Sequence, residues 1–430
     1  MPQMPFCSDA DALRWRHARV ALWAVLLAGA IAWSFWGTIG KPDCQDMDFG
    51  AYYRAALAVR QSHTPYTVDE YGPMAVYPYA PAFAYGFIPL TYLEYPWACR
   101  GWLIVNWLAT LACFFLAIKL LRLSGQEFEE IGDVILLALV PTSTYLWANL
   151  RVGQVSMIMV FGCLGWAYYQ QRGQRILGGA LLATASALKL APLAFVPYLV
   201  IQRDWRGLAG FVAGGMLLFA LPAGWVGWDG TWRLHHEWFQ HTANTQVPVQ
   251  IYRPGNQSLL AQLARLPPIS NGHECFSPEH LTQLTHAYPS LLLGLGATLY
   301  AWILWDRRRH RDTVARIRGP DRDPLHVALL LIFLTLASPR AWRCNFVALA
   351  LPCLMMAQVV CRRGTGSQLG LAALGLVLLA CVVPTNGIGE QGWNLGVWLL
   401  QGKHFWAALA LGGACWWTSR SPMLAGTARG

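Results

Sequence analysis

The chain has 430 residues, of which 55% are hydrophobic and only 13% carry a charge. Soluble globular domains have about 25% charged residues, so this composition excludes an ordinary soluble protein. Apolar runs recur from Val20 to Trp417, and several reach the roughly 17–25 residues that cross a bilayer. We therefore expect a single polytopic, all-α membrane domain over residues 1–430.

The hydropathy pattern predicts about twelve transmembrane helices. They are expected at residues 20–37, 101–121, 132–149, 154–169, 176–188, 190–201, 207–224, 288–305, 325–338, 344–360, 367–383 and 403–418. The first run follows a polar start with three arginines and lacks a small-residue cleavage site. It is therefore predicted to be a retained helix and not a cleaved signal peptide.

The positive charges predict the topology. Most of the 32 lysines and arginines fall in short segments on one side of the predicted helices, including a basic stretch at 306–324. Under the positive-inside rule this side is cytoplasmic, together with the N-terminus. Large loops at 40–100 and 225–287 then face outward from a plasma (inner) membrane. The net charge of +10 is explained by this topology, so membrane lipids and not nucleic acid are the expected surroundings.

The first outer loop contains three close aspartates in "PDCQDMDFGAYYRAA": Asp43, Asp46 and Asp48. One of them could cap the helix predicted to follow, which would lie along the membrane interface. A carboxylate beside apolar aromatic surface could instead serve as a general base. The D-x-x-D-x-D spacing lacks the glycine and glutamate of a calcium loop, so a metal site is the weakest of the three interpretations.

Four cations lie at predicted outer helix ends, against the positive-inside bias. They are Arg151, Lys189, Arg340 and Arg343, in "NLRVGQ", "ALKLAP" and "SPRAWRCN". Each could simply extend its head group to the interface. Together, and next to a helix break at the "KLAP" proline, they could bind an anion such as a phosphate within a polar chamber.

Histidines and cysteines do not form a recognisable metal motif. The "HHEWFQH" segment is not HExxH, and the eleven cysteines include no CxxC pair, so we expect no metal and no other cofactor. The outer histidines are expected to form hydrogen bonds in the loop. Cys44, Cys99 and Cys275 lie on the predicted outer side, where a disulfide among them is conceivable but its pairing is open.

Several segments occur in a characteristic order: "DFGAYYRAA", "VYPYAPAFAYGFIPL", "GQVSMIMVFGCLGWAYYQQRGQRILGGALLATASALKLAPLAFVPYLV", "GNQSLLAQLAR" and "SPRAWRCNFVALALP". In this order and spacing the chain resembles the family 87 glycosyltransferases over most of residues 40–360. That family includes membrane enzymes that use polyprenol-phosphate mannose. The resemblance implies a GT-C fold, with interfacial helices in the first outer loop and an active site that faces away from the cytoplasm.

The resemblance also implies roles for individual residues. Asp48, in the Asp-Phe pair before the interfacial helix, would be the catalytic base of an inverting transfer from a polyprenyl-phosphate sugar, with mannose the expected sugar, to a lipid or glycan hydroxyl. The four cations Lys189, Arg340, Arg343 and Arg151 would hold the donor phosphate. The expected substrate-binding residues are Asp46, Tyr52, Tyr53, Gln154, Asn256 and Gln257.

One segment departs from the family pattern. Relatives usually carry an SPxSWxHH-type stretch, whereas this chain has "SPRAWRCN", with Arg343, Cys344 and Asn345 at the end. Arg340 and Arg343 are expected to contact phosphate there. Two alternatives to such a transferase fit the composition: a multi-helix secondary transporter and a polymerase or ligase of lipid-linked glycans. Against the transporter, the charges lie at outer helix ends and the two halves show no repeat.

Overall fold

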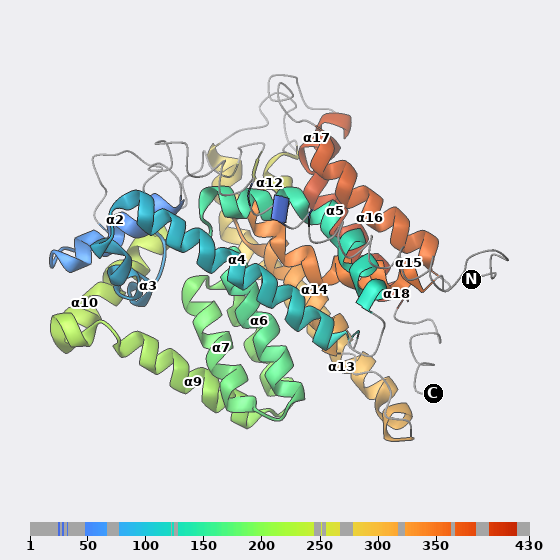
Figure 1. Ribbon diagram of the computed structural model, residues 1–430, viewed down its shortest axis with the longest axis horizontal. Coiled ribbons are helices and arrows are strands. Elements are labelled where there is room, and N and C mark those ends of the chain that lie inside the picture. Colours follow the sequence, from blue (N-terminus) through green and yellow to red (C-terminus); the bar gives the residue numbers. More distant parts are fainter. Residues whose placement is uncertain are drawn as a thin grey trace.

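The computed structural model describes residues 48–66, 77–121, 123, 128–244, 251, 255–266, 278–316, 323–362, 366–383 and 395–418, with the single positions 25, 28, 29 and 32. All regular structure within these ranges is helical (Figure 1). The all-α expectation is therefore confirmed for the described part of the chain. Asp43, Asp46, Cys44 and Cys275 lie outside the described residues.

Among the described residues, four helices are long and apolar enough to cross a membrane: α4 (Tyr95–Leu120), most of α5 (Phe128–Val152), the central part of α13 (Pro278–Arg316), and η5 (Arg343–Leu349) with α15 (Ala350–Cys361). A fifth candidate is α9 (Trp205–Ala220) followed by α10 (Ala223–Asn244), which form a pair bent by 98°. These helices support a membrane protein. The expected number of twelve crossings is not confirmed.

The difference in number has a structural reason. Several expected crossings are helices shorter than the span required by a straight bilayer crossing: α7 (Arg175–Leu188), α14 (Asp323–Ala337) and α16 (Ser367–Val382). The expected crossing at 190–201 is divided into a 3₁₀ turn, η4 (Ala191–Phe195), and the short α8 (Val196–Ile201). The expected crossings at 154–169 and 403–418 correspond to α6 (Ser156–Gln171) and α18 (Lys403–Thr418), and the short α17 (Leu395–Gln401) precedes α18.

The basic stretch predicted as a cytoplasmic loop is partly helical. Helix α13 continues without a break to Arg316, although the expected crossing ends at residue 305. Arginine has a high helix propensity, so the run of arginines after Asp306 extends the helix. Within the second predicted outer loop, α10 and α12 (Leu259–Ala264) are helical as well.

The first predicted outer loop folds into a small aromatic unit. It contains α2 (Asp48–Arg60), α3 (Pro81–Phe87) and the 3₁₀ turn η2 (Ile88–Tyr92). Helix α2 buries Phe49, Tyr52, Ala56 and Val59, which recur every three or four residues and so form one face of the helix. This face packs against α3, η2 and α4 in a core of Tyr, Phe and Trp rings.

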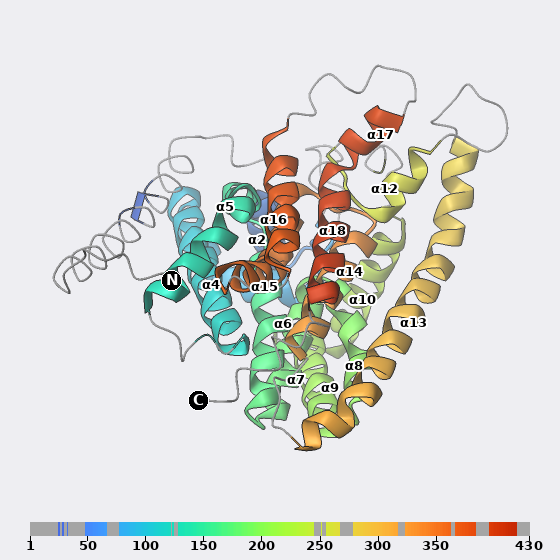
Figure 2. The same ribbon diagram turned by 90° about the vertical axis from the view of Figure 1, so that its right-hand side faces the viewer.

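The larger core surrounds α6 and α15. Helices α6, α7 and α9 pack side by side in one group, and α5, α15, α16 and α18 pack in another (Figures 1 and 2). Glycines allow α7 and α9 to approach closely, because a Cβ atom at Gly179 would lie 1.9 Å from the Gly207 carbonyl oxygen. Such close backbone approach is typical of helix packing in membranes. Gln154, Lys189 and Arg340 lie at the ends of helices of this core, between α5 and α6, between α7 and η4, and between α14 and η5.

Candidate active site

Asp48 lies in the first turn of α2, at the edge of the aromatic unit. A carboxylate in this position is favoured by the unpaired N–H groups and the positive end of the helix dipole. Burial raises the pKa of the Asp48 carboxyl from 3.8 to about 6, while the Lys189 ammonium and a hydrogen bond with the Gln154 side chain act in the opposite direction. Asp48 is therefore a stronger base than an ordinary aspartate.

Gln154 lies beside Asp48 because the chain turns sharply between α5 and α6. Gly153 adopts a positive φ of 68°, and a Cβ atom there would lie 2.8 Å from the Cβ of Phe49. Both observations require glycine at this position. The turn thus brings the start of α2 directly against the residue that precedes Gln154, which explains why Gln154 can reach Asp48.

The amide of Gln154 links three elements through hydrogen bonds. Its Oε1 accepts from the Tyr52 hydroxyl and the Tyr79 hydroxyl, each over 3.0 Å, and from the backbone N–H of Val155 over 3.0 Å. Since Oε1 is an acceptor only, the side-chain NH₂ is the group that can donate to Asp48. Gln154 is thereby fixed in one orientation, with its donor side facing the carboxylate.

Tyr52 and Tyr79 complete this part of the site. Their hydroxyl oxygens lie 3.0 Å apart, and both side chains are buried. Burial, together with the Asp48 charge, raises the pKa of each phenol above its ordinary value. Both residues therefore remain protonated, and can donate hydrogen bonds, throughout the physiological pH range.

Lys189 lies where α7 ends, in extended backbone immediately before η4. Its Nζ donates to Ser156 Oγ over 2.7 Å and to Asn345 Oδ1 over 2.9 Å. The Ser156 hydroxyl in turn lies 3.1 Å from Asn345 Oδ1. The helix therefore breaks at the "KLAP" segment, as its proline predicts. Ser156 and Asn345 hold Lys189 at this break, and the Lys189 ammonium is close enough to Asp48 to lower the pKa of the Asp48 carboxyl.

Arg340 belongs to the same site, on a loop between α14 and η5. It interacts electrostatically with Lys189 and with Tyr79, and its carbonyl oxygen accepts from Asn345 Nδ2 over 3.0 Å. The site therefore combines one carboxylate with two cations. These groups come from segments that are separated by up to about 290 positions in the sequence.

Asn256 and Gln257, which are predicted to bind substrate, form hydrogen bonds with the loop that carries Arg340. Asn256 donates to the Pro339 carbonyl over 3.0 Å and accepts from the Ala341 N–H over 3.0 Å. The backbone N–H of Gln257 donates to the Ala341 carbonyl over 2.9 Å, and its Oε1 accepts from the His404 N–H. Both side chains are buried. The "GNQS" segment therefore positions the residues on either side of Arg340.

Three other predicted site residues lie away from this cluster. Arg343 is exposed and acts electrostatically on Lys403 and His404 of α18. Arg151 is exposed at the end of α5. The Tyr53 hydroxyl donates to the Leu93 carbonyl, after η2, over 2.9 Å. The structure thus brings together Asp48, Tyr52, Gln154, Lys189 and Arg340 from the predicted set.

Sequence reasoning did not identify Tyr79, Ser156 and Asn345 as site residues. Each lies in or next to a segment that had been singled out: Tyr79 in "VYPYAPAF", Ser156 two positions after Gln154, and Asn345 in "SPRAWRCN". Ser156 lies two residues after Gln154, at the start of α6, so its position in the sequence could have indicated that it belongs to the site. The roles of Tyr79 and Asn345 depend on tertiary contacts and had no local signal.

The described residues contain no group of three or more His, Cys, Asp or Glu side chains arranged to hold a metal ion. The site groups themselves are one carboxylate, two cations, hydroxyls and amides. These could bind a phosphate ester through charge-assisted hydrogen bonds and could accept a proton from a hydroxyl group.

The helices and the site define a membrane protein with a partly buried cluster of one carboxylate and two cations at helix ends. The model of glycosyltransferase family 87 matches residues 77–318, more than half of the chain, and the protein belongs to this family. It is therefore a membrane glycosyltransferase. Tyr79, Gln154 and Lys189 fall within the matched range, while Asp48 and Arg340 flank it. Among curated proteins, none matches the chain.

Proposed function

We propose that the protein transfers a sugar, mannose in the first instance, from a polyprenyl-phosphate donor to the hydroxyl group of a lipid or glycan acceptor, with inversion at the anomeric carbon and without a metal. Asp48 is the general base. The observation that carries the proposal is the position of one partly buried carboxylate next to Lys189 and Gln154, in a chain whose family transfers sugars.

The proton transfer requires a base that works near neutral pH. A carboxyl group with a pKa of about 6 is ionised at pH 7 and still basic enough to take a proton as the acceptor oxygen bonds to the anomeric carbon. The Gln154 amide orients the carboxylate. The Tyr52 and Tyr79 hydroxyls, fixed on Gln154 Oε1, support this amide and line the same side of the site.

The leaving group requires positive charge. As the anomeric C–O bond breaks, the electron pair goes to the phosphate oxygen of the polyprenyl carrier, and the negative charge on that phosphate grows. Cations fixed in advance near this oxygen stabilise the transition state. Lys189 and Arg340 are the two cations of the cluster, and Ser156 and Asn345 hold Lys189 in place. Arg343 and Arg151 are less suitable, since both are exposed at other positions.

The proposed location follows from the charge distribution in the sequence. The basic segments lie in the cytoplasm of a plasma (inner) membrane, and the site opens on the other side, where a polyprenyl-linked donor is supplied through the bilayer. The family match does not favour the transporter alternative.

The test compares Asp48→Asn with Asp229→Asn, an exposed aspartate on α10, as a matched control. Each purified protein is reconstituted in liposomes with polyprenyl-phosphate [¹⁴C]mannose and a lipid extract of the source membranes as acceptor. We expect the wild type and Asp229→Asn to form labelled glycolipid, and Asp48→Asn to lose roughly 10²–10⁴-fold in rate. Full activity of a folded Asp48→Asn protein would exclude Asp48 as the base. Uptake of label without a glycolipid product would indicate transport.

A further inference from the structure

Helix α10 leaves the membrane domain at a steep angle. It follows α9 after a break of two residues, and the two helices are bent by 98° relative to each other. Helix α9 packs along α7, and its C-terminal end lies at the end of the molecule where α2 and α3 are found (Figure 1). If α9 runs across the bilayer, α10 runs approximately parallel to the bilayer surface at this end.

One face of α10 is attached to the segments that carry Asp48 and Tyr79. Glu237 accepts a hydrogen bond from the Thr64 hydroxyl over 2.6 Å, and Trp238 donates to the Pro78 carbonyl over 3.1 Å. Leu234 is buried in the same aromatic core as Tyr52. Thr64 lies just after α2, and Pro78 immediately precedes Tyr79. The inner face of α10 therefore holds both ends of the segment between α2 and α3.

The backbone of α10 is kinked at Gly227, where φ is 68°, and the exposed surface of the helix after this kink is divided into two flanks. At 100° per residue, Trp228, Trp232 and Phe239 form one flank, with exposed fractions of 61%, 65% and 71%. A second exposed flank is polar and consists of Asp229, Arg233, His236 and Gln240. A helix with one apolar aromatic flank and one charged flank is typical of a position within the membrane–water interface.

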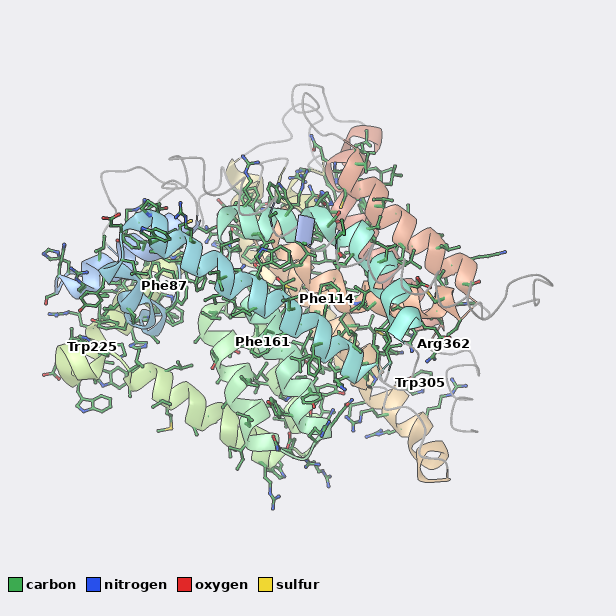
Figure 3. The ribbon with its side chains drawn as sticks, in the orientation of Figure 1. Phe87, Phe114, Phe161, Trp225, Trp305 and Arg362 are labelled. Carbon is green, nitrogen blue, oxygen red and sulfur yellow. The ribbon has the colours of Figure 1, made fainter. Side chains whose placement is uncertain are left out.

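The aromatic flank continues the apolar surface of α9. On α9, Val212, Met216 and Leu217 are exposed by 50%, 67% and 70%, as expected for side chains that face lipid. At the start of α10, Trp225 is also exposed and lies at the periphery of the molecule (Figure 3). Tryptophan is enriched where a membrane-embedded surface reaches the head groups. The change from aliphatic residues on α9 to tryptophans on α10 therefore follows the change from hydrocarbon to interface.

We propose that α10 is a membrane-surface helix: Trp228, Trp232 and Phe239 insert between phospholipid head groups and acyl chains, the polar flank faces water, and the inner face fastens the Asp48 segment. In this arrangement α10 fixes the height of Asp48 relative to the bilayer surface. The proposal depends only on the membrane domain and holds whichever sugar or acceptor the protein uses.

The test places the photo-cross-linking residue benzoylphenylalanine at Trp232 or at Phe239, on the aromatic flank. Matched controls carry it at Gln240, on the polar flank, and at Leu217, on the lipid-facing side of α9. Each full-length protein is reconstituted in phosphatidylglycerol–phosphatidylcholine vesicles and irradiated, and phospholipid adducts are measured by mass spectrometry. All four positions are exposed, so the substitutions leave the core unchanged. Size-exclusion profiles confirm that each variant is folded.

We expect adducts at Leu217, Trp232 and Phe239, with a yield several-fold higher than at Gln240. Adducts at Leu217 but at neither Trp232 nor Phe239 would overturn the proposal, because α10 would then lie in water. Equal yields at Trp232, Phe239 and Gln240 would also overturn it, because α10 would then be immersed in lipid on all sides. Loss of sugar transfer has no bearing on this readout, so the result is independent of the proposed reaction.

Discussion

Lys189 and Asn345 meet across 156 residues of chain: the lysine Nζ donates to Asn345 Oδ1 over 2.9 Å, and Ser156 Oγ contacts both. Lysine has a flexible stem, and these two acceptors fix it at the helix break. The contact thus joins the segment after α7 to the segment before α15, and it places a cation on the side of the site where Asp48 supplies the negative charge.

Removal of the Lys189 charge is expected to impair the departure of the phosphate. Lys189→Met should lower kcat for transfer by roughly 10²-fold, since a fixed cation at the leaving oxygen stabilises the transition state. Lys189→Arg, which keeps the charge, should retain part of this activity. Steady-state kinetics with a polyprenyl-phosphate sugar would measure the effect. Equal rates for Lys189→Met and the wild type would remove Lys189 from the mechanism.

The rate of transfer should depend on pH through Asp48. The carboxyl has a pKa of about 6 and acts as a base only when ionised, so kcat/KM should fall roughly tenfold per pH unit below 6 and level off above it. Profiles measured between pH 4.5 and 8.5 would show this acid limb. The acid limb should be missing from the residual activity of Asp48→Asn, and its persistence there would assign the titration to another group.

The same carboxyl should make stability depend on pH. Burial raises its folded pKa above the unfolded value, so the folded state binds this proton more tightly, and the associated stability is lost as pH rises through about 6. Asp48→Asn should therefore melt at a higher temperature than the wild type at pH 7.5, with the difference shrinking at pH 4.5. Thermal melts at the two pH values measure the effect, and Glu94→Gln, which replaces an exposed acid, is the matched control.

Gln154→Glu should shift the pH profile to higher pH. The substitution places a second carboxylate next to Asp48 and replaces an amide donor, and both changes disfavour the ionised Asp48. We expect the acid limb of kcat/KM to move up by about one pH unit or more. Gln154→Leu removes the donor without adding charge and should give a smaller shift. An unchanged limb in both variants would contradict the contact between Gln154 and Asp48.

Replacing Asn256 should loosen the loop that carries Arg340, because Asn256 forms hydrogen bonds with Pro339 and Ala341 on either side of it. Asn256→Ala leaves the Ala341 and Ser258 N–H groups without the acceptor that they share, at a cost of about 1–3 kcal/mol for buried groups that lose their partners. We expect a lower melting temperature together with weaker donor binding, since Arg340 is no longer fixed. Donor KM and thermal melts measure the two effects. Normal values of both would show that the loop is held by other contacts.

Two glycines of α9 provide a matched pair. A Cβ atom at Gly210 would lie 2.1 Å from the Ile176 carbonyl oxygen, whereas Gly215 has no atom within 4 Å of the same position. Gly210→Ala should destabilise the protein by about 1–3 kcal/mol, while Gly215→Ala should be neutral or stabilise it by up to about 1 kcal/mol through helix propensity. Unfolding in detergent monitored by circular dichroism distinguishes them. Equal effects would contradict the close packing of α7 on α9.

Local patterns were sufficient to predict some features but not others. The apolar runs predicted most helices, and the "KLAP" proline predicted the break at Lys189. The number of crossings was not predictable in the same way, because hydropathy cannot distinguish a full span from a helix such as α7 that ends within 14 residues. At the bend between α9 and α10, Pro222 indicates that the helix breaks, but no local pattern predicts the angle of 98° between the two helices.

Arg340 and Arg343 show how far the site could be predicted from the sequence. Both are arginines in one motif, and no local pattern distinguishes their roles. In the structure the loop before η5 turns between them, so Arg340 interacts with Tyr79 and Lys189 whereas Arg343 acts on His404. The amide Gln154 was identified, but its partners Tyr52 and Tyr79 lie 102 and 75 residues away, and only the folded chain establishes such contacts.

The distribution of the cluster along the chain also has a consequence for biosynthesis. Asp48 is translated early and Asn345 late, and the Lys189 ammonium has its full set of partners only when both flanking segments are present. While the segments between them are still being synthesised, Asn345 is absent and the Lys189 ammonium lacks one of its two acceptors. The polar cluster around Lys189 is therefore complete only late in synthesis, after the residue at position 345 has been added.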